Sequence, residues 1–548
     1  MSRLPPPPPP PPPVHRPPGR DDNPVDVATL PWAVLEGDNV KSMRVLPDGI
    51  VHHITTSPPY WALRDYGVAS SWWGGDKDCT HVPSKALLGR RAGRHDKGHS
   101  CDREVSSRAR VNAASTPSAG CFCQKCNAWH GALGLEPDPK LFAYHLIIVL
   151  RECRRILHKS GTMLLNLGDS FYGPSPVRAG RSASQGDMFP GAAETNRVLR
   201  ETTETHDMKT KDRVFLPHLV AMHMRQPWVR CDECGDEEHL MWWGQLPSGT
   251  KVCPRCEQPT TFKVVEQGWW MRMDNVWAKR NCMPDPTKDR PRAAHEFVFL
   301  CSKSPRYFWD GDAVMEPDNS GGKRALWSVW RIALASARWD YCLACCTWYE
   351  GPDRKFIKKR TYHAKEKDAE VTERTCPTCK ATDQWVDHFA MFPDRLPEIG
   401  ILGGTSAHGA CAECLAPWER VIELEGETTG RHKKQAAFAG DRGIRPSGGG
   451  TYLPKAVEVA KRHFKGWRPT CKCDTTDVVP CLVADPFNGS GTTILVAKRL
   501  QRRGLGFELN PSFVKLTEHR MAAEFPMGDL IATAPARSEP LGPPGGAP

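Results

Sequence analysis

The sequence predicts an α/β protein built around a mainly parallel β-sheet. Strand-like and helix-like patterns alternate between two proline-rich ends, which is typical of parallel sheets whose strands are joined by helices. A long helical pattern from Pro139 to Gly161 is followed at once by the apolar strand pattern of Thr162–Asp169. Near the C-terminus a strand, a helix and a strand follow one another directly, which is the order of a βαβ unit.

Each element in the first part of the chain has its own signal. Gly49–Thr56 is an apolar run typical of a strand. Pro139–Gly161 is expected to be a helix because it starts with proline, carries apolar residues at helical spacing, and ends with basic residues and glycine. His295–Asp310 is expected to be a strand that runs into an aromatic turn.

The C-terminal βαβ unit consists of "CLVADPF", "TTILVAKRLQRR" and "GLGFEL". Gly489 and Gly491 lie in the loop after the first strand, where they would let the backbone approach a ligand. Asp485 ends the first strand and Glu508 ends the second. A carboxylate at such a strand end can accept both hydroxyls of a ribose.

This loop is neither the G-x-G-x-x-G fingerprint nor a P-loop, because no Gly-Lys-Ser/Thr follows it. The features that cradle phosphates are therefore missing, and a nucleoside-type cofactor without a pyrophosphate is expected. The alternative is a tight glycine turn that binds nothing.

Composition limits the function classes. The 548 residues carry a net charge of +11, with a pI near 8.8, which suits a polyanionic partner. No run of 18 apolar residues occurs and the N-terminus has no apolar signal region, so neither a membrane span nor secretion is expected. Nine consecutive prolines, Pro5 to Pro13, predict a disordered tail, with a ligand for a proline-binding domain as the alternative.

The 22 cysteines are numerous, and many fall in close pairs. In a chain without a secretion signal this pattern favours metal binding over disulfides. Four groups offer four ligands each at the spacing of structural zinc sites. They are Cys79, His81, Cys123 and Cys126; Cys231, Cys234, Cys253 and Cys256; Cys342, Cys345, Cys376 and Cys379; and Cys411, Cys414, Cys471 and Cys473.

Some ligand assignments stay open. Cys121 or Cys101 could replace a ligand in the first group, and Cys346 could replace Cys345 in the third. Reduced cysteines packed as small apolar residues are the alternative to zinc, and they explain lone Cys153 and Cys301 better than the pairs. Four protein ligands leave no open position for chemistry, so these metals are expected to be structural.

Two motifs resemble those of a known family. "DPFNGSGTT" with "GFELNP" resembles the S-adenosylmethionine site of the amino-group DNA methyltransferases, and "TSPPYW" resembles their catalytic motif. Further similar segments are "LPDGIVHHITTSPPYWALRDYG", "KSGTMLLNLGDSF", "DRPRAAHEFVFLCSKSPRYFWD" and "FAMFPDRLPEIGILGGTS". The catalytic motif precedes the cofactor motif, as in the β class. The resemblance thus implies a circularly permuted, Rossmann-like methyltransferase sheet with inserted zinc-ribbon-like modules.

The resemblance also implies which residues bind S-adenosylmethionine. Asp38 matches a position near the adenine, with an ordinary turn as the alternative. Phe389 and Pro393 match a segment near the methionine end, with plain packing as the alternative. The other implied cofactor residues are Asp485, Pro486, Phe487, Gly489, Ser490, Gly491, Thr492, Glu508 and Asn510.

The catalytic residues implied are Ser57, Pro58, Pro59 and Tyr60. An exocyclic amine is a poor nucleophile because its lone pair is delocalised into the base. The Ser57 hydroxyl and the Pro58 carbonyl can accept from its two N–H groups and localise the lone pair. Both prolines stiffen this loop, and Tyr60 can stack on a base turned out of the duplex.

In the family, Ser-Pro-Pro-Tyr is mostly found with cytosine N4 targets, and Asp/Asn-Pro-Pro-Tyr with adenine N6. Ser57 therefore favours cytosine N4, with adenine N6 as the alternative. Methylation at cytosine C5 would need a cysteine nucleophile. The only Val-Pro-Cys sequence contains Cys481, which begins the cofactor strand and is therefore interpreted as a core residue. A zinc-ribbon DNA-binding protein with an inactive core, or an RNA methyltransferase, remain further alternatives.

The expected partner is duplex DNA, with a cognate restriction endonuclease as a candidate, in the cytoplasm of a bacterial or phage-infected cell. The basic run Arg354–Lys367 could follow phosphates or be a solvated loop. The expected segments are a tail 1–24, a catalytic half 25–175 with a zinc insert 76–130, a zinc-ribbon insert 176–264, core strands 265–312, a target-recognition region with a zinc ribbon 313–385, a cofactor segment 386–408, a zinc insert 409–477, a cofactor half 478–525 and a tail 526–548.

Overall fold

The structure is a computed structural model that describes a defined part of the chain. The described residues are 30–62, 68–75, 78–84, 120–172, 208–209, 211–240, 251–253, 256, 258–282, 287–318, 322–335, 339–342, 345, 347–350, 357–364, 369–382, 385, 393–425 and 461–525. The expected tails 1–24 and 526–548 lie outside these residues, as do Cys101, Cys346 and Phe389.

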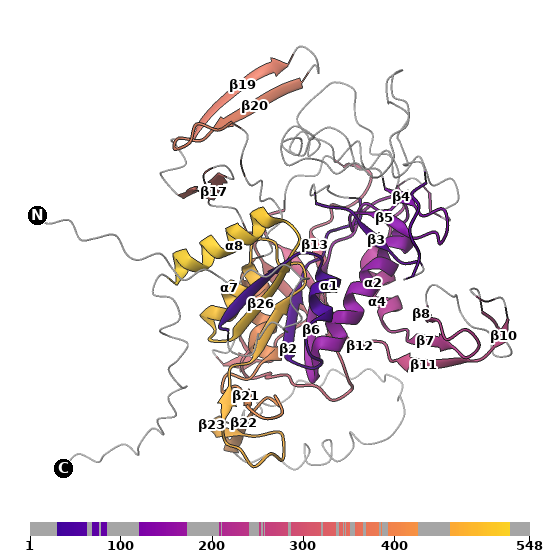
Figure 1. The fold of residues 1–548 in the computed structure, drawn as a ribbon. Coiled ribbons are helices and arrows are strands. Elements are labelled where there is room, and N and C mark those ends of the chain that lie inside the picture. Colours follow the sequence, from indigo (N-terminus) through magenta and orange to yellow (C-terminus); the bar gives the residue numbers. More distant parts are fainter. Residues whose placement is uncertain are drawn as a thin grey trace, which may run out of the picture. The chain divides into compact units, whose positions relative to one another are not determined.

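An eight-stranded sheet organises the larger of two compact units, which comprises residues 1–407 and 480–548 (Figure 1). Its strand order is β1 (Trp32–Glu36), β26 (Arg503–Glu508), β25 (Leu482–Asp485), β2 (Val51–Thr56), β6 (Leu157–Leu167), β13 (His295–Ser302), β12 (Trp270–Lys279) and β16 (Val329–Ile332). The strands from β1 to β6 are parallel, β13 and β12 each pair antiparallel to the preceding strand, and β16 is parallel to β12. The predicted α/β class is confirmed, with a mixed sheet.

Helices cover both faces of this sheet (Figure 1). Met163 and Leu165 of β6 pack with α1 (Asn39–Arg44), α2 (Pro139–Ile156) and α4 (Leu216–Met224). Leu164, on the opposite face, packs with α5 (Arg395–Gly404). That face also carries α7 (Thr492–Arg499) and α8 (Pro511–Glu524). No helix in the described part of the chain has the length and apolar character needed to cross a membrane.

One predicted boundary is wrong. The helix expected to reach Gly161 ends at Ile156, and β6 begins at Leu157. Leu157 is fully buried in an extended conformation opposite Val51 of β2, so burial in the sheet outweighs the helical pattern. Gly161 was interpreted as a helix terminator. Instead, it lets the irregular start of β6 lie against Leu157, whose Cγ would be 2.6 Å from an added Cβ.

The other predicted elements are confirmed with small changes at their ends. The expected strand Gly49–Thr56 is β2, the strand in His295–Asp310 is β13, and the C-terminal βαβ unit is β25, α7 and β26. The buried strand β2 contains His53, whose ring nitrogens contact Thr162 Oγ1 at 2.9 Å and Thr55 Oγ1 at 2.8 Å. Burial lowers the pKa of His53 to about 3, so this imidazole is neutral in the fold.

Small sheets carry the cysteine groups in the larger unit. The first group lies by β3 (Ser71–Trp73), β4 (Cys121–Phe122) and β5 (Trp129–Gly131), and the second by β7 (Trp228–Cys231), β8 (Glu237–His239), β9 (Lys251–Val252), β10 (Pro259–Thr260) and β11 (Phe262–Glu266). The third lies by β17 (Trp339–Cys342), β18 (Thr347–Glu350), β19 (Lys358–Ala364) and β20 (Ala369–Thr375). A further two-stranded sheet is β14 (Glu316–Pro317) with β15 (Lys323–Arg324).

The second compact unit is His408–Val479 and contains the fourth cysteine group. It consists of β21 (Ala410–Cys411) paired with β24 (Val478–Val479), and β22 (Glu419–Glu425) paired with β23 (Lys461–Arg468). The expected insert 409–477 falls within this unit. Arg420 lies over the rings of Trp467 and Phe464, so cation–π contacts join the two strands of its longer hairpin.

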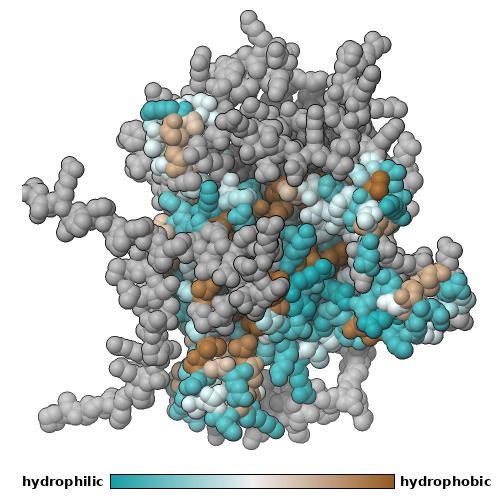
Figure 2. Space-filling model, viewed as in Figure 1, coloured by the Kyte–Doolittle hydropathy of each residue, from teal (hydrophilic) through white to brown (hydrophobic). Residues whose placement is uncertain are grey.

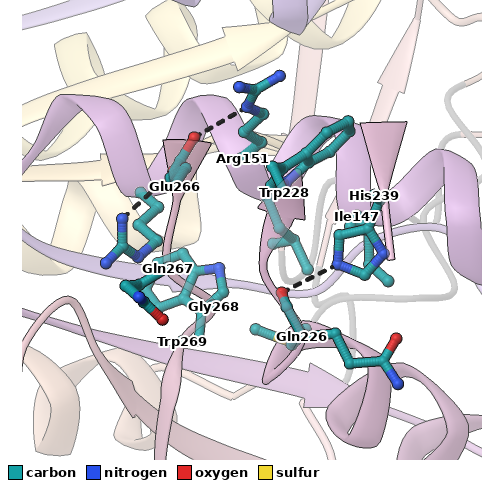
Figure 3. Close-up of a pocket in the computed structure, with 12 residues that line it drawn as sticks. Ile147, Arg151, Gln226, Trp228, His239, Glu266, Gln267, Gly268 and Trp269 are labelled. Carbon is teal, nitrogen blue, oxygen red and sulfur yellow. Dashed lines mark hydrogen bonds and ion pairs between the residues drawn. The ribbon is translucent and has the colours of Figure 1, made fainter. Parts of the chain in front are cut away.

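A small cavity marks where the second cysteine module packs on α2 (Figure 3). Arg151 of α2 donates to Glu266 of β11 at 2.8 Å and lies over the ring of Trp228, and His239 contacts the Gln226 carbonyl at 3.1 Å. The cavity measures about 10 Å³, which is room for one water molecule at most. It is therefore a packing defect between the module and the helix, and the predicted site residues do not line it.

The surface mixes polar and apolar residues. Figure 2 shows small brown hydrophobic patches separated by larger teal hydrophilic areas on the coloured part of this face. Trp327, which is 61% exposed, is covered on one side by the Arg324 guanidinium, 3.6 Å from its ring centre.

Candidate functional site

The two predicted motifs meet at one edge of the sheet. Ser57–Tyr60 follows the carboxyl end of β2, Asp485 is the last residue of β25, and Glu508 is the last residue of β26. Because β2 pairs with β25 and β25 with β26, these strand ends are neighbours. The motifs are far apart in the sequence, but the sheet places them side by side.

Asp485 joins the two motifs directly. Its Oδ1 accepts a hydrogen bond from Thr56 Oγ1 at 2.7 Å, although Thr56 is 429 positions away in the sequence. The same oxygen also accepts from the Phe487 backbone N–H at 3.0 Å. Its Oδ2 accepts from Thr493 Oγ1 at 2.7 Å. Burial raises the pKa of Asp485 to about 6. Both carboxylate oxygens are engaged inside the protein, so Asp485 fixes the end of β2 against the glycine loop.

Glu508 is held where the glycine loop turns into α7. Its Oε2 accepts from the Gly489 backbone N–H and its Oε1 from the Asn510 backbone N–H, each at 2.8 Å. Burial raises the pKa of Glu508 to about 7. Gly491 has φ of +79°, and a Cβ there would be 2.4 Å from Thr517, so this turn requires glycine.

The remaining loop residues are held by internal hydrogen bonds. Arg520 of α8 donates to the Ser490 carbonyl, to Ser490 Oγ and to Thr492 Oγ1. The Pro486 carbonyl accepts from Asn39, and Asn510 caps α8 by accepting from the Ser512 N–H. Phe487 packs against the main core, and Asn488, which the sequence analysis did not select, keeps a buried Oδ1 without a partner among the described residues.

Asp38 lies beside the same strand ends. The Gly37 N–H donates to the Glu508 carbonyl at 2.8 Å, which places the turn after β1 next to β26. The Asp38 side chain caps α1 by accepting from the Lys41 N–H, and it also accepts from Ser71 Oγ at 3.3 Å. Pro393 is buried just before α5, and the position of Phe389 lies outside the described residues.

The Ser57–Tyr60 loop is tied to residues that the sequence patterns did not single out. Ser57 Oγ lies 3.4 Å from Tyr60 Oη, and Tyr60 Oη donates to Glu296 Oε2 at 2.6 Å. Asn166 Nδ2 donates to Tyr60 Oη at 2.7 Å and to Glu296 Oε2 at 2.8 Å. Lys279 Nζ forms an ion pair with Glu296 Oε1 at 2.5 Å. Asn166, Glu296 and Lys279 come from β6, β13 and β12, and only their position near strand ends could have suggested them.

A second set of contacts supports the loop after Tyr60. The Ala62 N–H donates to the Gly134 carbonyl, and Trp61 Nε1 donates to the Glu136 carbonyl, each at 2.8 Å. Ala62 has φ of +54°, a conformation that is uncommon for a non-glycine residue. Gly134 lies against Pro59, with 3.3 Å between an added Cβ and the Pro59 Cβ. The segment Ser57–Ala62 is therefore held from both sides.

The buried pair of Glu136 and His145 anchors this support. Glu136 Oε1 lies 3.0 Å from His145 Nδ1, and its Oε2 accepts from the Gly134 N–H at 2.8 Å. Trp73 and Trp129 both stack on the His145 ring, with ring centres 5.5 Å apart in each case. Trp129 belongs to β5, so the first cysteine module is packed onto the loop that holds Ala62.

All four predicted cysteine groups come together. In each, the four ligand atoms lie within 4.8 Å of one another, with the membership predicted from the sequence. Cys121 is not in the first of these groups. The measured Sγ–Sγ distances include 3.9 Å for Cys79–Cys123, 3.9 Å for Cys234–Cys253 and 3.7 Å for Cys342–Cys379. Tetrahedral zinc with Zn–S bonds of about 2.3 Å places its sulfurs about 3.8 Å apart, so the groups have the geometry of structural zinc sites.

A family model described as DNA methylase matches residues 51–409 and 480–519 of this chain. The gap in the match coincides closely with the second compact unit, His408–Val479. The strands, helices and loops at the shared sheet edge all lie inside the matched ranges, except for β1, Asp38, α1 and the last residues of α8.

Two curated proteins illustrate the sequence similarity. The Type II methyltransferase M.Cfr9I of Citrobacter freundii is 26% identical over 300 residues, which cover 55% of this chain and 63% of that protein. The Type II methyltransferase M.SmaI of Serratia marcescens is 24% identical over 302 residues, which cover 55% of this chain and 66% of that protein. The matched part of this chain thus spans just under two thirds of the length of these relatives.

Solved structures are less similar. A chain described as PvuII DNA methyltransferase (cytosine-N4-specific) aligns with 89% of this chain and 86% of its own length, at 14% identity and a TM-score of 0.35. A TM-score this low carries no argument about function.

Proposed function

The chain belongs to the N6/N4 DNA methylase family, and we propose that it transfers a methyl group from S-adenosylmethionine to the exocyclic N4 amine of cytosine in duplex DNA. The observation that carries this proposal is the hydrogen bond from Thr56 Oγ1 to Asp485 Oδ1. It fixes the Ser57–Tyr60 loop beside the glycine loop and Glu508, so that an amine acceptor and a nucleoside-binding carboxylate share one sheet edge.

The residues at this edge fit the nucleoside end of such a cofactor. The Glu508 carboxylate lies at the end of β26 and can accept ribose hydroxyls. At Gly489 an added Cβ would meet no atom nearer than 3.9 Å, so the backbone there is open to a ligand. The buried, unpartnered Oδ1 of Asn488 offers one more acceptor beside this turn. When bound, S-adenosylmethionine supplies an electrophilic methyl group on sulfur.

Ser57 and Pro58 prepare the target amine. The hydroxyl of Ser57 and the carbonyl of Pro58 accept from its two N–H groups, which localises the nitrogen lone pair for attack. One N–H of the N4 amine is engaged in the base pair, so both N–H groups can be bound only after the cytosine turns out of the helix, where the Tyr60 ring can stack on it. The fixed loop keeps both acceptors positioned before the substrate arrives.

The choice of base rests on Ser57, through the resemblance of "TSPPYW" to motifs of cytosine N4 enzymes. Adenine N6 with the same chemistry is the alternative. The order of the motifs, catalytic first and cofactor last, supports a circularly permuted arrangement. The relatives are named Type II methyltransferases, which supports a role in restriction–modification beside a cognate endonuclease.

Each of the four cysteine groups is proposed to hold one structural Zn²⁺. The support is the clustering of four ligand atoms in every group at sulfur spacings that suit tetrahedral coordination. Since all four positions are filled by the protein, these ions would stabilise small modules and take no part in methyl transfer.

The test of the proposed function is nucleoside mass spectrometry of DNA from cells that express the full chain. N4-methylcytosine is the expected product, and mapping its positions would give the recognition sequence. N6-methyladenine would keep the mechanism and overturn the choice of base. If neither base is modified while the protein is soluble and binds S-adenosylmethionine, the proposed DNA substrate is wrong.

The affinity for S-adenosylmethionine is expected to rise with pH through about 7. Glu508 must be ionised to accept both ribose hydroxyls well, and burial raises its pKa to about 7, above its usual value of 4.5. At pH 6 about one tenth of the molecules would carry the carboxylate, so Kd should be about tenfold weaker than its plateau above pH 8. Calorimetric titration from pH 5.5 to 8.5 measures this dependence. Glu508→Gln should bind weakly with little pH dependence, and an equally pH-dependent Gln variant would contradict the assignment.

A further inference from the structure

A line of hydrogen-bonding groups leads from the catalytic loop to a carboxylate. Ser57 Oγ donates to Tyr60 Oη at 3.4 Å, and Tyr60 Oη donates to Glu296 Oε2 at 2.6 Å. We propose that Glu296 takes up, through Tyr60 and Ser57, the proton that the target amine must lose. This inference rests on the proposed function and adds to it the destination of that proton.

The reaction requires such an acceptor. The amine nitrogen forms a bond to the methyl carbon as the carbon–sulfur bond breaks, and the electrons of the broken bond stay on sulfur. The nitrogen then carries a positive charge until one of its protons leaves. That proton passes to Ser57 Oγ, the Ser57 proton passes to Tyr60 Oη, and the Tyr60 proton passes to Glu296 Oε2. The positive charge of the sulfonium passes to nitrogen with the methyl group and then leaves with the proton, which neutralises the carboxylate of Glu296. Charge and atoms therefore balance.

Glu296 is placed and oriented for this role. Lys279 holds its Oε1 at 2.5 Å, which leaves Oε2 turned toward Tyr60 and Asn166. The side chains of Lys279 and Glu296 are only 19% and 12% exposed, so the pair is shielded from bulk water. Asn166 donates to both Tyr60 Oη and Glu296 Oε2, which holds the phenol and the carboxylate next to each other.

The other buried carboxylates near the loop are already committed. Asp485 accepts from Thr56, Thr493 and Phe487, and Glu136 accepts from Gly134 and contacts His145. Among the described carboxylates, the hydrogen bonds place only Glu296 against a side chain of the Ser57–Tyr60 loop. Glu296 acts through Tyr60 and not on the substrate itself, so it is a positioning residue that also holds the proton.

Several charged or titratable groups lie near Glu296. Lys279 on β12 faces it directly, and His295 is its neighbour on β13. Asp169 and Arg213 form an ion pair at 2.7 Å beside His295. The pKa of His295 is lowered, chiefly by burial, so this imidazole is neutral at physiological pH and adds no positive charge.

The test compares Glu296→Gln, Tyr60→Phe and the double variant in single-turnover methylation of duplex DNA, with full-length protein and saturating S-adenosylmethionine. Each single variant should lower the rate about a hundredfold, the lower end of the range typical of general acid–base groups. The double variant should be no slower than the slower single variant, because both changes break one relay. Glu152→Gln on α2, which neutralises a carboxylate paired with Arg44 of α1 and Arg155 of α2, should match the wild type.

Two further readouts separate proton transfer from a structural role. The calorimetric Kd of S-adenosylmethionine and the thermal midpoint of Glu296→Gln should stay close to those of the wild type. Tyr60→Phe keeps the aromatic ring and removes only the hydroxyl that joins Ser57 to Glu296, so it should slow methylation without changing either readout. This variant decides the question if Glu296→Gln does not fold.

The proposal is overturned if Glu296→Gln or Tyr60→Phe methylates at the wild-type rate, or if the effects of the two single changes multiply. A wild-type protein that methylates no DNA would instead contradict the proposed function. These two failures are therefore distinguishable in one set of assays.

Discussion

Replacing Ser57 by alanine is expected to slow methylation about 100- to 1000-fold, the loss typical for one preorganised hydrogen-bonding group in an active site. The affinity for S-adenosylmethionine should change by less than about twofold. Ser57 lies between the buried end of β2 and Pro58, and its hydroxyl contacts only Tyr60 and Asn166 among the described residues, each at 3.4 Å. Its removal would take away one acceptor for the amine and leave the glycine loop unchanged.

The matched control is Glu508→Ala, for which the opposite pattern is expected. That change removes the acceptor at the end of β26 and the two backbone hydrogen bonds from Gly489 and Asn510. It should weaken cofactor binding strongly, while the rate at saturating cofactor falls less. Single-turnover rates and calorimetric Kd values on both variants measure the two effects. If Ser57→Ala weakens cofactor binding and Glu508→Ala mainly slows turnover, the assigned roles are wrong.

The parts of the site that could be predicted from sequence are local. The Ser57–Tyr60 loop, the Gly489–Gly491 turn and the close cysteine pairs each occupy a few consecutive positions, where turn chemistry and ligand spacing are direct signals. The four metal groups could also be assembled correctly, because each consists of two such pairs in chain order. Local patterns likewise identified β2, β13, β25, α7 and β26.

Glu296 and Asn166 could not be selected from the sequence, because their contacts with the Ser57–Tyr60 loop depend on strand pairing. Glu296 reaches Tyr60 across 236 positions and Asn166 across 130, and both contacts follow from the order β2, β6, β13 in the sheet. No local pattern specifies which strands become neighbours, so these side chains could not be selected. Asp485 shows a related limit. Its strand-end position predicted a ligand contact, but the fold also uses both of its oxygens to join Thr56 and Thr493.

Loss of metal from the first cysteine group is expected to slow turnover, although this group takes no part in the chemistry. Cys123 and Ala128 are joined by a backbone hydrogen bond of 2.7 Å, and the chain then enters β5 and reaches Gly134 and Glu136. Those two residues accept hydrogen bonds from Ala62 and Trp61 directly behind the catalytic loop. A bound ion would therefore stabilise the module that supports the Ser57–Ala62 loop.

Cys126→Ser tests this connection. It removes one of four ligands, and loss of a structural metal should lower the free energy of unfolding of the module by about 4 kcal/mol or more. The positive φ of Ala62 is retained only while its surroundings enforce it, so a loosened module should let the loop relax. We expect the single-turnover rate at saturating DNA and cofactor to fall about tenfold or more, a cost typical of small misplacements in a catalytic site.

Cys379→Ser is the matched control, because it removes a ligand of the third group, and the hydrogen bonds of the described residues do not connect that group to the Ser57–Ala62 loop. It should also lose about one zinc per chain by metal analysis, but without a comparable fall in the single-turnover rate. Equal losses of rate in both variants would mean that metal only maintains the fold as a whole. Purified wild-type protein without zinc would contradict both the metal assignment and this coupling. A rate loss confined to Cys126→Ser would show that the first module supports the Ser57–Ala62 loop through Gly134 and Glu136.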